Sequence, residues 1–260
     1  MKNILKIMLM MITIFTIAGS AVYAAEIPVS DQDQLITSSD WTEISNLQDE
    51  MKKEEPDATI DYDKALKVYV DCNLIKLQTA DTKKLTSALE SANYVWVIPF
   101  KMEKTYGMFT VAKGLPLREE AKSVLTKAEQ EEVKNHAGKW MITETAEHTV
   151  EPYYDILLEK REALSDCTRV VLVGSQPGMR QPVALGMDDE TARIWISLGY
   201  QYPVMEKIPE TQNVESGVYS FESVADISDT YIEDSEVSTG AGVQSRSSMK
   251  YVAGIGIIVI

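Results

Sequence analysis

Few residue types in this chain could carry out chemistry, and the two cysteines come first. Cys72 and Cys167 are the only thiols among the 260 residues. In an oxidising compartment they could form a disulfide, which would stabilise the fold by about 4 to 5 kcal/mol on the chain-entropy model. The alternatives are two buried free thiols or a nucleophile. A nucleophile would need a histidine beside it and a third group to orient that histidine, and no local signature supports this.

The histidines and carboxylates give a weaker signal. Neither histidine, His136 or His148, lies in a zinc-binding pattern. Glu144 and His148 are four residues apart, as on one face of a helix, and Glu151 lies three further on. Pro152 and the β-branched residues nearby argue against a continuous helix there. We therefore predict no metal ion and no cofactor, and no catalytic residue can be named.

Aromatic side chains are the remaining candidates for a binding site. Several lie in or just beyond predicted strands, where an exposed set could contact a ligand. Aromatic residues at strand spacing pack against helices more often than they face solvent, so a place in the core is the alternative. The six candidates are Tyr94, Trp96, Tyr106, Trp195, Tyr200 and Tyr202.

Two capping patterns mark predicted helices. Asp40 is followed three residues later by Glu43, the spacing of a capping box, and apolar residues then recur on one helical face. Thr126 and Glu129 have the same spacing. Because this second box falls inside residues 115–138, that stretch is predicted to hold two short consecutive helices instead of one long helix.

Strands are predicted where apolar and polar residues alternate. Residues 65–72 form one such run, and residues 94–100 and 108–112 are predicted to form a hairpin. Pro99 cannot donate a ladder hydrogen bond, which places its strand at a sheet edge or ends it there. Residues 168–199 contain three strand-like runs separated by turn residues, the pattern of a three-stranded meander.

The order of these elements predicts the fold class. Helices are also predicted at 81–92 and from Pro152, each followed by a hairpin, so a globular domain at 40–208 could consist of two helix-hairpin halves, 40–138 and 139–208. Hairpins interrupted by helices predict an α+β fold, in which a mainly antiparallel sheet built from hairpins and a meander is covered by helices and followed by a flexible acidic stalk. A doubly wound parallel sheet is not expected.

The N-terminus has the composition of a secretory signal peptide. Residues 1–24 contain a basic start, an apolar stretch and small residues near a cleavage point, so we expect a mature chain from Ala25 with a polar lead-in at 25–39. An uncleaved anchor is the alternative, although the apolar stretch is shorter than the roughly 20 residues that a span needs. The protein is then expected to be exported to the cell surface or the extracellular space.

Charge limits the partners. The chain has a net charge of −15, and cleavage would also remove Lys2 and Lys6. Such a surface repels phosphate backbones, so nucleic-acid binding is not expected, whereas other exported proteins and envelope ligands remain as partners. Acidic pairs such as Asp31 and Asp33 are best explained as a solvated face, because they lack the length and the glycine of a calcium loop.

The C-terminal part differs from the rest in composition. Residues 209–248 are predicted to be an acidic linker rich in Ser, Thr and Gly, with a short strand docked through Val218, Tyr219 and Phe221 as the alternative. The apolar tail at 249–260 is interpreted as the start of a membrane span, which would make the membrane a partner. A terminal strand that returns to the sheet, or a contact for another subunit, are the alternatives.

These features predict an exported, membrane-tethered domain that binds a ligand, senses a signal or takes part in envelope assembly without catalysis. A secreted hydrolase that uses acidic residues is the alternative, because glycosidases need only two carboxylates and the chain has 40 acidic residues. The two hypotheses differ in the surface that they require: a hydrolase needs convergent carboxylates in a cleft.

Overall fold

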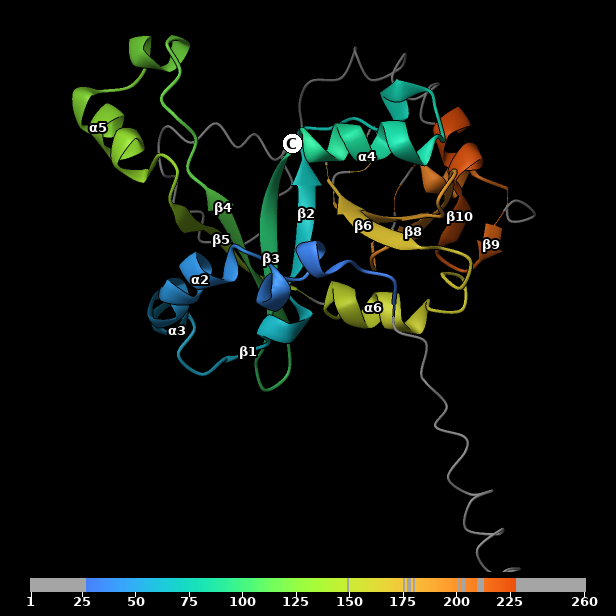
Figure 1. The fold of residues 1–260 in the computed structure, drawn as a ribbon. Helices are drawn as coiled ribbons and strands as arrows, with labels where there is room; N and C mark the ends of the chain where they lie inside the picture. The colour runs from blue at the N-terminus through green and yellow to red at the C-terminus, as the bar shows by residue number, and fades with distance from the viewer. Residues whose placement is uncertain are drawn as a thin grey trace, which may run out of the picture.

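One large β-sheet with helices on both faces forms the structure (Figure 1). The computed structural model describes residues 27–148, 150–174, 176, 179, 181–200, 202, 204–209 and 213–227. The strands are β1 (Thr59–Ile60), β2 (Leu66–Val70), β3 (Asn93–Lys101), β4 (Tyr106–Lys113), β5 (Trp140–His148), β6 (Arg169–Val173), β7 (Val183–Met187), β8 (Ala192–Ser197), β9 (Asn213–Glu215) and β10 (Val218–Ser220). The α-helices are α2 (Trp41–Ile44), α3 (Gln48–Glu54), α4 (Thr82–Glu90), α5 (Lys127–His136) and α6 (Tyr153–Glu159).

Short 3-10 helices fill many of the connections. They are η1 (Asp31–Asp33), η2 (Leu35–Thr37), η3 (Ser45–Leu47), η4 (Tyr62–Lys64), η5 (Ile75–Leu77), η6 (Glu120–Ser123) and η7 (Met205–Lys207). A further helical segment covers residues 221–227. Among the described residues, no helix has the length and apolar composition needed to span a membrane.

The sheet consists of two antiparallel halves joined at its centre. Its strand order is β5-β4-β3-β2-β6-β7-β8-β10-β9, and β1 pairs with β3 outside this path. The central pair, β2 and β6, is parallel, with Val68 opposite Leu172, whereas the other strand pairs within the described part of the chain are antiparallel. The α+β fold with a mainly antiparallel sheet is therefore confirmed, and the meander predicted at 168–199 is present as β6, β7 and β8.

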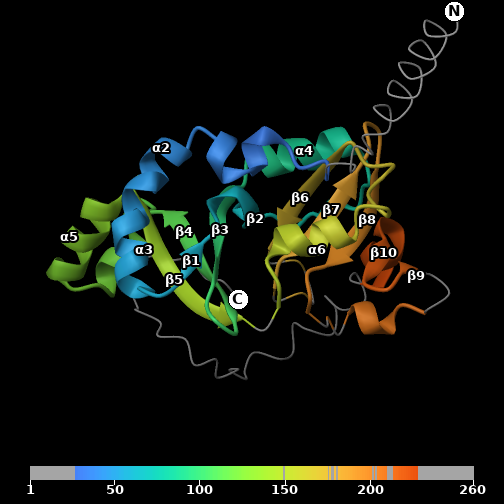
Figure 2. The same cartoon turned by 90° about the horizontal axis from the view of Figure 1, so that it is seen from below.

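Alternation along the strands gives each face of the sheet its own core. On one face, Val68 and Leu172 belong to a cluster that also contains Leu157 of α6. On the other face, Tyr69 belongs to a cluster with Leu85 of α4, and α2 and α3 cover the part of this face formed by β3 and β4. Figures 1 and 2 show α4 and α6 on opposite sides of the sheet. Burial of each such aliphatic side chain contributes about 1.5 to 3 kcal/mol.

The two capping predictions have opposite outcomes. Thr126 accepts a hydrogen bond from the Glu129 backbone and Glu129 bonds back to Thr126, so this capping box is confirmed at the start of α5. The box at Asp40 is wrong, because Asp40 has helical backbone angles and makes no side-chain cap bond. The single helix predicted from Asp40 is instead α2, η3 and α3 in succession.

The prediction for Pro99 is also wrong, because β3 is an interior strand. It has β4 on one side, and on the other side β2 up to Val97 and β1 from Phe100. The Pro99 carbonyl accepts a hydrogen bond from Asp61 N at 2.9 Å. A strand residue directs its C=O and its N–H to the same side, so the missing donor of Pro99 faces the interval between β2 and β1.

The acidic linker cannot begin at residue 209 as predicted. β10 pairs with β8, with Val218 opposite Ile196, and Val218, Phe221 and Val224 are buried. The docked strand that was the alternative is therefore present, because apolar residues at strand spacing outweigh an acidic composition. The rest of the predicted linker, the predicted signal peptide and the apolar tail lie outside the described residues.

Candidate functional site

The predicted aromatic surface is wrong for half of its members. Trp96 and Trp195 have no exposed surface, and Tyr202 is 3% exposed. Strand alternation turns both tryptophans toward the face covered by α2, α3 and α4, where Trp195 stacks on Phe221 with ring centroids 5.6 Å apart. The other three candidates are partly buried: Tyr94, Tyr106 and Tyr200.

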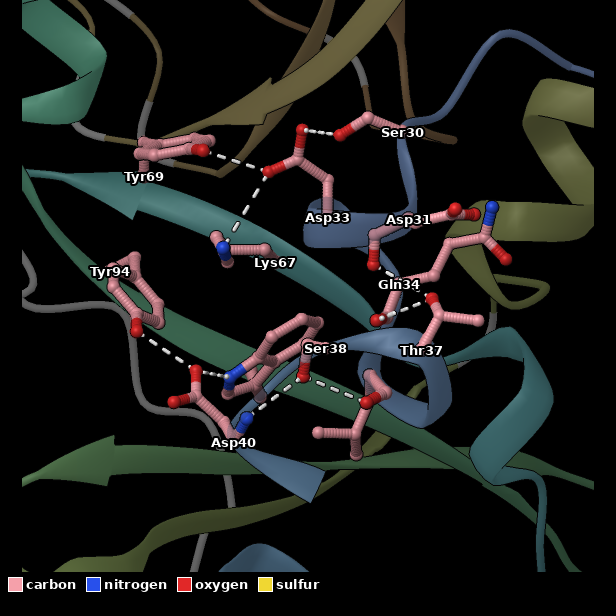
Figure 3. Close-up of polar contacts among 12 residues, drawn as sticks. Ser30, Asp31, Asp33, Gln34, Thr37, Ser38, Asp40, Lys67, Tyr69 and Tyr94 are labelled. Carbon is pink, nitrogen blue, oxygen red and sulfur yellow. Dashed lines mark hydrogen bonds and ion pairs between the residues drawn. The ribbon is translucent and has the colours of Figure 1, made fainter. Parts of the chain in front are cut away.

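Tyr94 and Trp96 instead hold the carboxylate of Asp40. The Tyr94 hydroxyl donates to Asp40 Oδ2 at 2.8 Å, and Trp96 Nε1 donates to the same oxygen at 3.0 Å (Figure 3). Two donors from β3 thus occupy the oxygen that a helix cap would have used. Hydrogen bonds to an ionised acceptor are about twice as strong as neutral ones, which explains why this arrangement prevails over local capping.

A second carboxylate, Asp33, is buried in the same region. Only 2% of Asp33 is exposed, and its oxygens accept hydrogen bonds from Tyr69 Oη at 2.7 Å, Ser30 Oγ at 2.7 Å and Arg169 Nη2 at 3.0 Å. Lys67 Nζ lies 3.8 Å away. The expected solvated face is therefore wrong for Asp33, because a buried carboxylate requires such partners.

Lys67 lies between the two carboxylates and against three aromatic rings. Its Nζ is 4.5 Å from the ring centroid of Tyr94, 5.2 Å from that of Trp96 and 5.8 Å from that of Tyr69. Burial lowers the pKa of the Lys67 ammonium, while the charges of Asp33 and Asp40 act in the opposite direction. We call this group the Lys67 cluster: Asp33, Asp40, Lys67, Tyr69, Tyr94, Trp96 and Arg169.

A pocket of about 300 Å³ opens beside the Lys67 cluster and shares Tyr94 with it. It lies where β2 and β4 end and β3 and β5 begin. Its aliphatic lining includes Val70 and Val95, which belong to the α6 side of the sheet, whereas Tyr94 and Trp140 belong to the opposite side. The pocket therefore wraps around the strand ends, and Ala112, Leu115 and Ala137 complete its apolar wall.

Two charged residues stand at the rim of this pocket. Lys113 is exposed, and its Nζ lies 5.4 Å from the ring centroid of Trp140. Asp71 is also exposed and accepts a hydrogen bond from Asn93 Nδ2 at 3.1 Å. The lining thus combines a mainly apolar interior with one cation and one anion from its described residues.

Gly114 joins the end of α5 to the end of β4 and so closes one side of the pocket. Gly114 N donates to Lys139 O at 2.9 Å, and Gly114 O accepts from Gly138 N at 2.8 Å. A Cβ at position 114 would lie 2.2 Å from the backbone oxygen of His136. Only glycine allows this close approach of the two backbones.

The tryptophans at positions 96 and 140 provide a matched test of the site. Trp140 Nε1 is buried with no hydrogen-bond partner among the described residues, whereas Trp96 Nε1 donates to Asp40. Trp96→Phe should therefore lower the free energy of unfolding by about 1.5 kcal/mol more than Trp140→Phe, since only the first leaves a charged acceptor short of a donor. Urea denaturation of the two variants measures the difference. Equal losses would contradict the assignment of the Asp40 contact.

A second pocket, of about 500 Å³, has two carboxylates in its lining. Glu222 and Asp226 lie one turn apart on the helical segment 221–227, and both are exposed. They therefore stand on one wall. A glycosidase needs its two carboxyl groups on either side of the bond to be cleaved, which these positions do not provide.

The candidate disulfide is absent, and the alternative of two free thiols is what the structure has. Cys167 belongs to the core cluster on the α6 face of the sheet, whereas Cys72 packs against the cluster on the α4 face. The sheet therefore separates the two residues. Burial raises the pKa of both thiols to about 11, so a thiolate nucleophile is disfavoured at neutral pH.

This arrangement predicts slow alkylation of the native protein. With a pKa of about 11, roughly one thiol in a thousand is ionised at pH 8. In 8 M urea, iodoacetamide should react with both cysteines at about the same rate and without any reductant. Without urea, the same reaction should be far slower. Intact mass spectrometry counts the added groups. If alkylation in urea required prior reduction, the two free thiols would be disproved.

A continuous helix around His148, against which the sequence argues, is absent from the described residues. Glu144 and His148 lie on strand β5 and not on a helix. His148 Nδ1 is 2.9 Å from the Tyr200 hydroxyl, and burial lowers the pKa of this imidazole. Among the described residues, no group of three or more His, Cys, Asp or Glu side chains is arranged to hold a metal ion.

No protein-family model matches this chain, and neither a curated protein nor a solved structure is significantly similar to it. The pocket and the Lys67 cluster are therefore the features that bear on function. Of the aromatic residues named from the sequence, Tyr94 and Trp96 belong to the cluster and Tyr94 also lines the pocket, but the other members come from distant parts of the chain and were not indicated. Lys67 gave no such signal either, because it occupies a polar position of an alternating strand.

Proposed function

We propose that this chain is a non-catalytic binding domain, exported and tethered to a membrane, whose ligand is a small and mainly apolar molecule. The observation that carries the proposal is the 300 Å³ pocket at the ends of β2, β3 and β4, with its aliphatic wall and the rings of Tyr94 and Trp140. Ligand sites in proteins are concave and mostly apolar, with a few polar groups at defined positions, and start at about this volume.

The Lys67 cluster supports the proposal because it fixes one wall of the pocket in advance. Tyr94 is held at its hydroxyl by Asp40 and at its ring face by the Lys67 ammonium. A side chain fixed at two points loses little conformational freedom when a ligand arrives, so more of the contact energy appears as affinity. The buried charges then have a role in positioning, apart from any effect on stability.

The hydrolase alternative receives less support. Among the described residues that line the 300 Å³ pocket, Asp71 is the one carboxylate, and it accepts a hydrogen bond from Asn93. Acid-base hydrolysis of a glycoside needs a second carboxylate about 5 to 10 Å away across the bond to be cleaved.

Export and tethering have a separate basis, the leader predicted at 1–24 and the tail at 249–260. Cell fractionation with N-terminal sequencing of the product would test them.

Ligand binding can be tested with a probe that fits the pocket. Octanoate and 1-octanol are titrated into the protein, with calorimetry to measure affinity and amide NMR shifts to locate the contact. At least one probe should bind saturably and shift the amide signals of residues in the pocket wall. Ala137→Phe should abolish this binding, because the larger side chain fills the pocket from the end of α5.

The control is Ala128→Phe, which adds the same ring at an exposed position of the same helix. It should leave the affinity unchanged. If neither probe binds saturably, or if Ala137→Phe binds as well as the parent protein, the proposed function fails.

A further inference from the structure

We infer that the ligand of the 300 Å³ pocket is an apolar anion, a short-chain carboxylate whose charged end binds at Lys113. This inference rests on the proposed function and specifies its ligand. It is carried by the distribution of charge at the pocket rim, which differs between the Lys113 end and the Asp71 end.

Lys113 is a cation that has no ion pair within the described part of this strongly acidic protein. The chain has 40 acidic and 25 basic residues, and ion pairs join some of the cations to carboxylates. Lys64 pairs with Asp155, and Arg193 pairs with Asp188. Lys113 forms no ion pair with the described residues, and its ammonium instead makes a cation–π contact with the ring of Trp140. A ligand carboxylate would be its first charged partner.

The position of Lys113 suits such a contact. Lys113 is paired directly with Trp140 in the β4–β5 register, and both residues line the pocket. The ring of Trp140 therefore places the ammonium at the pocket mouth, next to the apolar wall. A carboxylate bound at this point would leave its hydrocarbon chain against the parts of Val70, Val95 and Ala112 that line the pocket.

Asp71 carries the negative charge at the pocket rim, and it lies too far from Lys113 to repel a carboxylate bound there strongly. It follows β2, whereas Lys113 ends β4, and β3 lies between them. Strands two positions apart are about 10 Å from one another, close to the Debye length of about 8 Å at physiological salt. Asp71 also already accepts a hydrogen bond from Asn93. The same screening removes most of the repulsion between an anionic ligand and the net charge of −15. The charge nearest to the bound ligand, that of Lys113, therefore decides whether the pocket prefers an anion.

Pocket size limits the length of the ligand. Water takes about 30 Å³ per molecule in the liquid, so about 300 Å³ accommodates roughly ten non-hydrogen atoms. Octanoate has about this size, which makes it a suitable probe. Octanol and octylamine have the same chain with a neutral and a cationic end, and together the three isolate the effect of charge.

The test compares the affinities of these three probes at pH 7 and physiological salt. Octanoate should bind about tenfold more tightly than octanol, and octylamine should bind most weakly, because only octanoate can pair with the ammonium. Lys113→Gln should reduce the affinity for octanoate to that for octanol and leave the affinity for octanol unchanged. The control, Lys127→Gln, removes an exposed lysine at the other end of α5 and should alter neither affinity.

The possible failures have different meanings. Equal affinities for octanoate and octanol, or an octanoate affinity that Lys113→Gln does not change, would overturn the anion inference and leave the apolar binding site intact. Tightest binding of octylamine would also overturn it, and would assign the preference to Asp71. If none of the three probes binds saturably, the proposed function fails together with this inference.

Discussion

Asp33→Ala is expected to lower the free energy of unfolding by about 3 to 5 kcal/mol, the usual cost of removing one partner from a buried ion pair. The carboxylate is 2% exposed and faces Arg169 at 3.0 Å and Lys67 at 3.8 Å. Without it, Arg169 loses its ion-pair partner, Lys67 keeps only the more distant charge of Asp40, and Tyr69 loses its acceptor. Urea unfolding followed by circular dichroism gives the change in stability.

The adjacent Asp31 provides the control for this experiment. Asp31 belongs to the same 3-10 helix as Asp33 but is exposed, so Asp31→Ala should change stability by no more than about 0.5 kcal/mol. Asp33→Asn should give an intermediate loss, since the amide oxygen can still accept hydrogen bonds but carries no charge. Similar losses for the two alanine variants would show that the buried ion pairs contribute little.

Trp195→Ala is the second variant with a large expected effect, a loss of about 3 to 5 kcal/mol. The indole has no exposed surface and stacks on Phe221, so its removal leaves a cavity beneath the helical segment 221–227. That segment should then open more often than the rest of the domain. Limited proteolysis should cut the variant within 213–227 under conditions in which the parent protein resists.

Tyr106→Ala serves as the comparison for Trp195→Ala. Tyr106 is another aromatic residue of the sheet, but it is only partly buried, at the start of β4. Its truncation should cost far less, about 1 kcal/mol. If Trp195→Ala were as stable and as resistant to protease as Tyr106→Ala, residues 213–227 would not be an integral part of the domain.

The sequence predicted those parts of the structure that depend on neighbouring residues. The Thr126 capping box, the 94–112 hairpin and the 168–199 meander all follow from local spacing, and all three are present. Local spacing failed where distant groups compete for the same atom. Asp40 has the spacing of a helix cap, but two donors from β3 occupy its carboxylate.

Of the candidate site, Tyr94 and Trp96 were named from the sequence, but the arrangement of the site could not have been predicted in this way. Asp33 meets Arg169 across 136 positions of sequence, and neither residue has a local pattern that marks its partner. The pocket likewise combines the ends of four strands with the end of α5. None of these segments has a composition that marks a binding site, and the cavity exists only because the fold brings them together. The prediction of a linker from residue 209 failed for a related reason. Val218, Phe221 and Val224 contact their apolar neighbours only in the folded domain, so local composition does not show that they are buried.

The parallel pair at the centre of the sheet has a consequence for the order of folding. Each antiparallel half joins strands that are close along the chain, so its turns can close rapidly. Contact between β2 and β6 must wait until the intervening residues and β6 itself have been synthesised. Closing so long a loop carries a large entropic cost, and topologies with such contacts fold slowly. During this interval, the facing edges of β2 and β6 are unprotected and open to strands of other molecules.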